Sequence, residues 1–172
     1  MTDPFRAELI GLLPRLRRFA LGLTANPDRA DDLVQAGCER ALSRQHQFQP
    51  GTKLDSWMFR ILQNLWIDQL RSPRSEVTAE QEEVENVPDR DWDSGFEAKL
   101  TLAQVVAAMG KLPAPMRAVL TLVCVDGQSY KQAAEVLDVP IGTVMSRLAR
   151  ARLELHRLLQ AGGQEAAHAH LH

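Results

Sequence analysis

The sequence predicts an all-α protein in which two small helical domains are joined by an acidic linker. Apolar residues recur every three or four positions through both halves of the chain, which is the spacing of a helical stripe. No segment of useful length alternates apolar and polar residues as a half-buried strand does. Formal charge divides the 172 residues into three parts, with +3 over residues 1–74, −7 over residues 75–99 and +2 over residues 100–172.

The N-terminal domain, residues 1–74, begins with a predicted helix over Pro4–Thr24. Its apolar stripe consists of Leu9, Leu12, Leu13, Leu16, Phe19, Ala20 and Leu23. Pro14 lies inside this stripe, and we expect it to kink or divide the helix because proline removes a backbone donor and crowds the preceding turn. The next helix begins with Asn26 as N-cap and Pro27 at the first helical position, and it runs to about Ser43.

This second helix is predicted to have one apolar and one polar face. The inward positions are Ala30, Leu33, Val34, Gly37, Cys38, Ala41 and Leu42. The polar face shows Asp31, Asp32, Gln35 and Glu39. The pattern alone favours a solvated surface for these four side chains.

A loop over residues 44–53 is followed by a long predicted helix over Leu54–Arg71. Its apolar stripe consists of Leu54, Trp57, Met58, Ile61, Leu62, Leu65 and Leu70. Its other face carries Phe59, Arg60, Gln63, Asn64 and Asp68, and nearby are Phe48, Lys53 and Arg74. Bases stack on aromatic rings while Arg and Lys hold phosphates, so this mixture is typical of single-strand nucleic-acid binding. Trp66 is expected in the core, and the pattern leaves Trp57 open between core and surface.

The acidic linker, residues 75–99, has little apolar periodicity and contains Pro88 and Gly95. The C-terminal domain, residues 100–161, then begins with a predicted helix over Thr101–Met109. A second helix starts after Pro113 and stops at Gly127.

A helix-turn-helix is predicted next. Ser129 and Gln132 have the spacing of a capping box at the start of a short helix, and residues 138–140 form a tight turn. A longer helix opens near Thr143, with Val144, Leu148, Ala151, Leu155 and Leu158 inward and Ser146, Arg147, Arg150, Arg152 and Arg157 outward. In this motif the second helix enters the major groove of DNA, where arginine pairs with both acceptors of guanine.

Several other classes of function are excluded or disfavoured by the composition. No nucleophile–base set, phosphate loop or metal-ligand spacing is present, so the sequence predicts neither an enzyme nor a cofactor. There is no run of about 18 apolar residues and no signal peptide, which indicates a cytoplasmic location. Cys38 and Cys124 are interpreted as buried, reduced thiols, and residues 162–172 as a flexible tail.

Four segments together carry a resemblance to a known family: DRADDLVQAGCERAL, HQFQPGTKLDSW, WMFRILQNLWIDQLR and DGQSYKQAAEVLDVPIGTVMSRLARARLEL. In this order they resemble the sigma-70 family of bacterial transcription initiation factors. The greatest likeness is to the small group called extracytoplasmic function (ECF) sigma factors, which carry only regions 2 and 4. The wording FQPGT and GTVMSRL looks most like the subgroup that controls the general stress response in alphaproteobacteria.

The resemblance implies partners and a role for each matching residue. The implied partners are core RNA polymerase, through its β′ and β subunits, promoter DNA and an anti-sigma factor. The residues at the positions that bind the polymerase are Asp31, Asp32, Leu33, Gln35 and Glu39. Those at the −10 element are Phe48, Lys53, Trp57, Phe59, Arg60, Asn64 and Arg71. Those at the −35 element are Thr143, Met145, Ser146, Arg147, Arg150 and Arg152, with Arg117 and Lys131 on the DNA backbone.

Two positions depart from the family's pattern. Many relatives have Lys or Arg where this chain has Met145, and Ala149 is small where a larger residue is common. One DNA contact is then missing, or is replaced by apolar contact with a thymine methyl group. The −35 consensus of better-known members therefore does not transfer to this chain.

Two other interpretations of the sequence stay open. One is a sigma-like decoy or adaptor that binds an anti-sigma protein without acting on promoters. The other is a stand-alone helix-turn-helix regulator, which leaves the DDLVQ and WMFRILQN motifs without a role. A further hypothesis is that the free chain is compact, with its two domains packed together and their DNA-binding faces hidden.

Overall fold

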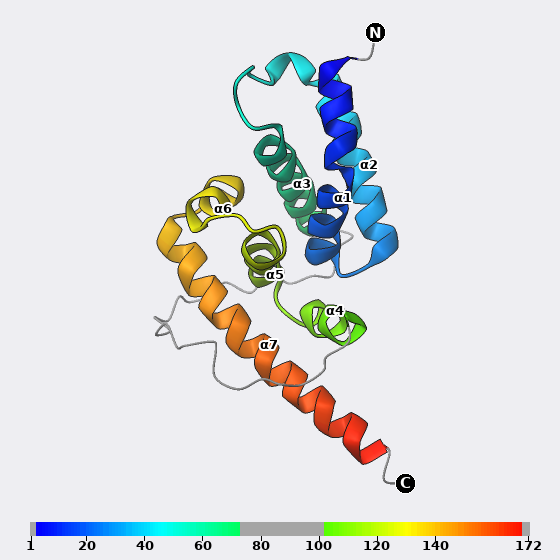
Figure 1. Cartoon of the computed structure of the whole chain (residues 1–172), viewed down its shortest axis with the longest axis vertical. Helices are drawn as coiled ribbons and strands as arrows, with labels where there is room; N and C mark the ends of the chain where they lie inside the picture. Colours follow the sequence, from blue (N-terminus) through cyan, green and yellow to red (C-terminus); the bar gives the residue numbers. More distant parts are fainter. Residues whose placement is uncertain (1–2, 73–101, 170–172) are drawn as a thin grey trace.

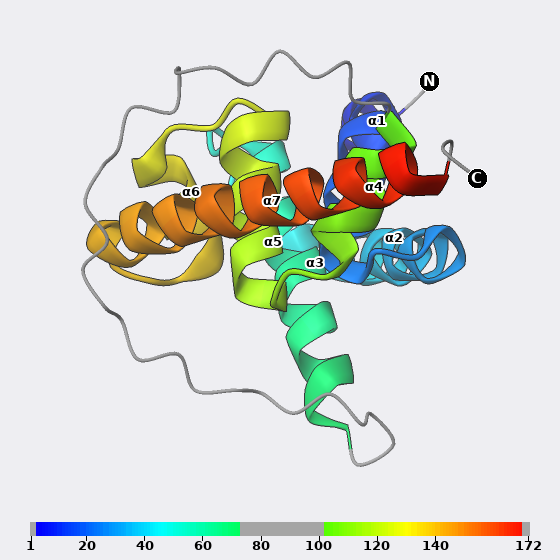
Figure 2. The same ribbon diagram turned by 90° about the horizontal axis from the view of Figure 1, so that it is seen from below.

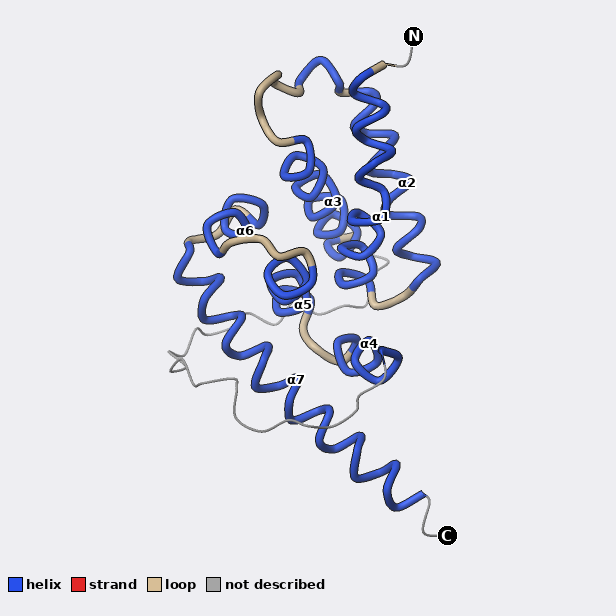
Figure 3. The backbone as a smooth tube through the Cα atoms, in the orientation of Figure 1, coloured by secondary structure: helices blue, strands red, loops and turns tan. Residues whose placement is uncertain are grey.

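Helices make up the regular structure throughout the part of the chain that is described, as the all-α prediction requires (Figures 1 and 3). The computed structural model describes residues 3–72 and 102–169, with side chains described up to residue 163. The predicted acidic linker, residues 75–99, lies outside the described residues. We refer to residues 3–72 as the N-terminal unit and to residues 102–169 as the C-terminal unit.

The N-terminal unit is built from three long helices and a short turn of 3₁₀ helix. These are α1 (Pro4–Thr24), α2 (Pro27–Ser43), η1 (Gln45–Gln47) and α3 (Leu54–Arg71). Their predicted stripes meet in a core whose largest fully buried side chains are Leu16, Phe19, Leu23, Leu33, Leu54, Met58, Phe59 and Leu62. Asn26 caps α2 as predicted, because its side chain accepts a hydrogen bond from the Arg29 backbone N–H at 3.0 Å.

Two details of this unit differ from the sequence-based expectation. Pro14 does not divide α1, which is helical from Pro4 to Thr24, and the alternative that it kinks the helix stays a prediction. Pro14 and Ile10 both lie on the exposed side of α1, where water can satisfy a carbonyl group that proline deprives of its donor. Leu42, expected to point inward, is 41% exposed because it lies in the last turn of α2, where the packing against α1 and α3 ends.

The C-terminal unit contains five helical elements. These are α4 (Leu102–Gly110), α5 (Ala114–Leu120), the π-helical turn η2 (Thr121–Val125), α6 (Tyr130–Leu137) and α7 (Ile141–Ala169). The predicted capping box of α6 is present, because Gln132 N–H donates to Ser129 Oγ at 3.1 Å and Ser129 N–H donates to the Gln132 side chain at 3.0 Å. Asp138 ends α6 in the left-handed conformation, with φ 55°.

Other details of the C-terminal unit depart from the expectation. The π-helical turn extends α5 into the loop, and no residue pattern announces it. Cys124 lies in this turn and is exposed, and Cys38 is half-buried. The prediction that both thiols are buried is therefore wrong. The helix α7 continues to Ala169, whereas the sequence analysis places a flexible tail at residues 162–172.

The two units pack directly against each other. Helix α1 of the N-terminal unit contacts α4, α5 and η2 of the C-terminal unit, and α3 contacts α6. Figure 2 shows α7 lying across α4, α5 and α6. One contiguous core therefore runs from Phe5 near the start of α1 to Leu155 on α7.

Candidate functional site

The polar face of α2 is exposed to solvent. Asp31, Asp32, Gln35 and Glu39 are all exposed, and the Gln35 side-chain amide donates to Glu39 at 3.1 Å. Asp31 also lies 3.8 Å from the guanidinium of Arg17, but both side chains are about two-thirds exposed, so the pair is weak. Leu33, predicted with this group, is fully buried and can act only by holding the helix in place.

Three aromatic rings form a corner at the end of the N-terminal unit. The ring centroid of Phe48 lies 5.3 Å from that of Trp57 and 5.7 Å from that of Phe5. Phe48 and Trp57 are half-buried, and Lys53 beside them is exposed. The sequence analysis missed Phe5, although Phe5 stands four residues before Leu9 and therefore shares its helical face.

Phe59 is part of the core, which corrects its prediction as a DNA contact. Its ring is fully buried and meets the ring of Phe19 edge to face, with centroids 5.0 Å apart. The guanidinium of Arg15 closes the remaining side of the ring at 5.4 Å. Phe59 therefore anchors α3 in the core, and no surface of its ring is available for a base.

The other polar positions of α3 lie on the surface. Arg60, Asn64 and Arg71 are exposed. The Arg60 guanidinium donates to the backbone carbonyl of Glu135 on α6 at 2.6 Å, so it bonds to the C-terminal unit. Trp66 is buried, as predicted for a core residue, and the guanidinium of Arg29 lies over its ring at 5.1 Å.

The helix-turn-helix carries the remaining predicted DNA-contacting residues. Met145 on α7 is 49% exposed and Lys131 on α6 is exposed. The other predicted residues of the first three turns of α7 are partly exposed: Thr143, Ser146, Arg147, Arg150 and Arg152. Because they recur every three or four positions, the helix brings several of them to the same side.

Arg117 on α5 is placed differently from the prediction. Its guanidinium donates to the carbonyls of Gly22 at 3.0 Å and Leu23 at 2.7 Å on α1, and to that of Leu112 at 2.6 Å. Burial lowers the pKa of Arg117, although an arginine still keeps its charge. In this arrangement its donors are therefore used inside the protein and not on a DNA backbone.

Arg15 connects the two units, and the sequence analysis did not single it out. It donates from Nε and a terminal nitrogen to both carboxylate oxygens of Asp126, at 3.0 and 2.8 Å, and to Asp55 at 3.0 Å. The hydrogen bond from Arg15 to Asp126 raises the pKa of Arg15 and keeps it charged. The sequence showed only that Arg15 lies among the arginines of α1, and no spacing links it to a residue 111 positions away.

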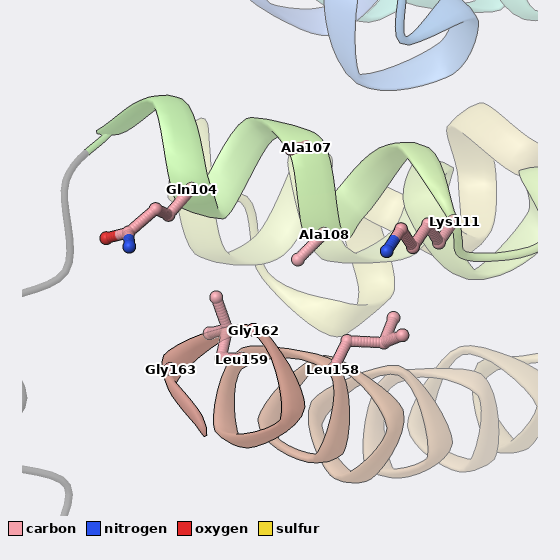
Figure 4. Close-up of a pocket in the computed structure, with 8 residues that line it drawn as sticks. All are labelled: Gln104, Ala107, Ala108, Lys111, Leu158, Leu159, Gly162 and Gly163. Carbon is pink, nitrogen blue, oxygen red and sulfur yellow. The ribbon is translucent and has the colours of Figure 1, made fainter. Parts of the chain in front are cut away.

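A small hollow of about 150 Å³ lies between α4 and α7. Figure 4 shows Gln104 and Lys111 toward its two ends, with Ala108 and Leu158 between them. Its walls are mainly alanine, leucine and glycine, so it offers no set of groups that could do chemistry. In the described ranges, no helix has the length and apolar character needed to cross a membrane.

Comparison with known proteins assigns both units to regions of one protein family. The Sigma-70 region 2 family model matches residues 11–76, and the Sigma-70 region 4 family model matches residues 102–155. The ECF RNA polymerase sigma factor EcfG of Rhodopseudomonas palustris is 40% identical over 165 residues, which cover 96% of this chain and 90% of that protein. Two such regions on one chain define a sigma factor of the sigma-70 family.

Two solved structures share the arrangement. One is the sigma factor RpoE in complex with the anti-sigma factor NepR from Bartonella quintana, with a TM-score of 0.73 and 33% identity, covering 92% of this chain and 98% of that one. The other is CnrH in complex with the cytosolic domain of CnrY, with a TM-score of 0.65 and 27% identity, covering 91% and 88%. The chain belongs to the ECF group of the sigma-70 family of RNA polymerase sigma factors.

Proposed function

We propose that this chain binds core RNA polymerase and directs it to promoters through their −10 and −35 elements. The observation that carries the proposal is the pairing, on one chain of this family, of an exposed acidic helix face with a helix-turn-helix. The chain performs no chemistry of its own in this function. The polymerase supplies the catalysis, and the sigma factor supplies the choice of start site.

The polymerase-binding surface is the polar face of α2. Asp31, Asp32, Gln35 and Glu39 project from one rigid helix, and Leu33 anchors that helix in the core. In the family, this helix docks on the coiled coil of the β′ subunit. Because the four polar side chains are already in solvent in the free protein, docking requires no rearrangement of α2.

The −10 surface is the aromatic corner together with the exposed face of α3. Phe48 and Trp57 offer half-buried rings on which a base can stack, and Lys53, Arg60, Asn64 and Arg71 offer charged or polar groups. Removing a base from the duplex stack costs a few kcal/mol, and stacking on an aromatic ring recovers about 1–3 kcal/mol. Phe59 contributes from the core by supporting α3.

The −35 surface is the N-terminal half of α7. Arg147 and Arg150 are the residues best suited to base edges, and Met145 offers an apolar contact. Lys131 at the start of α6 holds the DNA backbone, as Arg117 does once it is released from its internal bonds. The −7 charge of residues 75–99 repels phosphates, so the polymerase supplies most of the affinity for promoters.

The proposal includes an inhibitory partner and a place of action. The RpoE and CnrH structures are complexes with an anti-sigma factor and with the CnrY cytosolic domain, which supports an anti-sigma partner for this chain as well. The chain acts in the cytoplasm, where the polymerase and the chromosome are. Its proposed working parts are residues 1–74 and 100–161, connected by residues 75–99.

Run-off transcription with core RNA polymerase tests this function. The chain is expected to start transcription at a subset of promoters from its native genome. The double substitution Arg147→Ala with Arg150→Ala removes two proposed −35 contacts, and we expect at least a tenfold loss of transcript because each base contact is worth about 1–3 kcal/mol. Binding to core polymerase, measured by pull-down, stays unchanged because α2 is untouched.

The matched control is Arg157→Ala. Arg157 lies on the same helix but pairs with Glu154 on its exposed surface, far from the N-terminal turns. This variant should transcribe like the unmodified chain. No transcript from any native promoter, while a control sigma factor works, would reject the proposal. Retained binding to an anti-sigma protein in that case would favour the decoy interpretation.

A further inference from the structure

The start of α1 lies against the loop that carries Phe48. In the aromatic corner of Phe5, Phe48 and Trp57, the ring centroids of the three pairs lie 5.3, 5.7 and 6.2 Å apart. Aromatic rings attract each other at these distances in tilted or edge-on geometry. Phe5 is buried, whereas Phe48 and Trp57 are half-buried. Phe5 therefore forms the inner wall of the corner, and the rings that reach solvent are those of Phe48 and Trp57.

One carboxylate connects the two segments that meet at this corner. Oδ1 of Asp3 accepts a hydrogen bond from the backbone N–H of Phe5 at 3.1 Å and so caps α1. Oδ2 of Asp3 accepts from Nε2 of Gln45 at 3.3 Å, although the two residues are 42 positions apart. The backbone carbonyl of Gln45 in turn accepts from the N–H of Phe48 at 3.1 Å. A chain of hydrogen bonds therefore runs from the first turn of α1 to the backbone of Phe48.

The loop of residues 44–53 also forms short-range bonds within itself. The backbone N–H and the hydroxyl of Thr52 both donate to the carbonyl of Gln49, at 3.2 and 2.6 Å. Bonds of this kind form a turn, but they do not fix where a loop lies against the rest of a protein. Contacts with other elements fix that position. Trp57 of α3 supplies such a contact, and so do Asp3 and Phe5 of α1.

We propose that Asp3 and Phe5 are positioning residues for the −10 element, which hold Phe48 where its ring can stack on an unpaired promoter base. The inference rests on the proposed function, which gives Phe48 and Trp57 to that element. Asp3 and Phe5 act through the loop and do not touch the base. Both precede residues 11–76, which the Sigma-70 region 2 family model matches, so the pattern of that region does not include them. A loop that is already in place loses less freedom when a base arrives, and the base is bound more tightly.

Amide hydrogen exchange of the free chain, followed by NMR, tests whether α1 holds the loop. Phe5→Leu keeps an apolar side chain in the core but removes the ring that Phe48 and Trp57 contact. We expect the Phe48 amide to exchange about fivefold faster, because the loop opens more often. The matched control is Phe19→Leu, the same change on the same helix, since the ring of Phe19 contacts Phe59. Loop amides exchange by local opening, so this control should leave Phe48 unchanged.

Two substitutions at Asp3 separate the cap of α1 from the connection to the loop. Serine also caps helices but has a single side-chain oxygen, so Asp3→Ser keeps the cap and loses the bond to Gln45. We expect the Phe48 amide to exchange about threefold faster in this variant, as the loss of one hydrogen bond predicts. Asp3→Asn is the rescue variant. Its oxygen can cap α1 while its NH₂ group donates to the amide oxygen of Gln45, so exchange should match that of the unmodified chain.

Holoenzyme reconstituted from core RNA polymerase and each variant tests the effect on the base. The template is a promoter at which the unmodified chain starts transcription. Further copies of it are abasic at one non-template-strand position of the −10 element at a time. Fluorescence anisotropy measures the affinity of each holoenzyme for each template. On the intact promoter we expect Phe5→Leu to bind about fivefold more weakly.

The abasic copies show whether this loss depends on a base. On the copy that lacks the captured base, Phe48 has nothing to stack on, so Phe5→Leu and the unmodified chain should bind equally. On the other copies the fivefold difference should remain. Asp3→Asn should bind like the unmodified chain on every template, and Asp3→Ser should lose affinity only where the base is present.

Unchanged exchange at Phe48 in Phe5→Leu or in Asp3→Ser would overturn the inference for that residue, and equal acceleration in Phe19→Leu would overturn it for Phe5. An equal loss of affinity on every template would also overturn it, because a general structural defect does not depend on a base. Circular dichroism shows that each variant keeps its helices before it is compared. The exchange experiment uses no polymerase. Failure of run-off transcription by the unmodified chain would therefore count against the proposed function, and failure of the exchange test against the positioning role of α1.

Discussion

The two units reach their folds by different means. The N-terminal unit buries large side chains between long helices, including Leu16, Phe19, Met58 and Phe59. The described core of the C-terminal unit contains more small residues, among them Ala118, Ala133 and Ala151, and its helices α5 and α6 have only seven and eight residues. Helices this short are marginal on their own, so the C-terminal unit depends more on caps, turns and contact with its neighbour.

The exposed surface shows the same contrast. In the described side chains, the large exposed apolar residues of the C-terminal unit are Leu102, Val125, Ile141, Met145 and Leu153, while those of the N-terminal unit are Ile10 and Leu42. A helix-turn-helix that reads DNA must keep much of its surface uncovered. The comparison teaches that the N-terminal unit uses its large apolar residues mainly in the core, whereas the C-terminal unit leaves more of them on its surface.

Core truncation gives the largest expected difference between the units. Phe59→Ala removes a fully buried ring from the N-terminal core and should lower the free energy of unfolding by about 3–5 kcal/mol. Leu148→Ala in the C-terminal core should cost about 2–3 kcal/mol, because small neighbouring elements can collapse around the lost volume. Urea unfolding followed by circular dichroism measures both values. A larger loss for Leu148→Ala would reverse the comparison.

Helix capping gives an intermediate effect. Ser129→Ala removes one bond of the capping box on α6 and should cost about 1–2 kcal/mol, and Asn26→Ala removes a single cap from α2 and should cost about 1 kcal/mol. The eight-residue helix α6 has fewer other contacts to compensate. Hydrogen exchange should therefore show faster opening of α6 in Ser129→Ala than of α2 in Asn26→Ala. Equal protection of the two helices would contradict this contrast.

Thiol reactivity gives the smallest and most local test. Burial raises the pKa of Cys38 in the N-terminal unit, whereas Cys124 in the C-terminal unit is exposed. At pH 8 a raised pKa leaves less of Cys38 as thiolate, so iodoacetamide should modify Cys124 roughly tenfold faster, as followed by mass spectrometry. The ratio should shrink as the pH rises and Cys38 ionises. A ratio that stays constant with pH would show that access alone controls the rate.

Most of the helices could be predicted from local signals. The bounds Pro27–Ser43 and Leu54–Arg71 follow from a cap, a proline and an apolar period, and these act within a few residues. The sequence pattern did not reveal that Phe59 is buried. An apolar stripe shows which side of a helix faces the core, but not how far neighbouring helices cover the flanks of that side. The bonds from Arg15 to Asp126 and from Arg117 to Gly22 were also hidden, since they depend on how the two units pack and join residues 111 and 95 positions apart.

The missing side chain of Gly22 has a consequence for exchanging parts between relatives. The distance between α1 and the start of η2 is set by a glycine on one side, Gly22, and a threonine on the other, Thr121. A hybrid chain that takes its second half from another sigma factor would close in the same way only if position 121 stays small and position 117 stays arginine. The two halves are therefore matched to each other where the end of α1 meets α5 and η2.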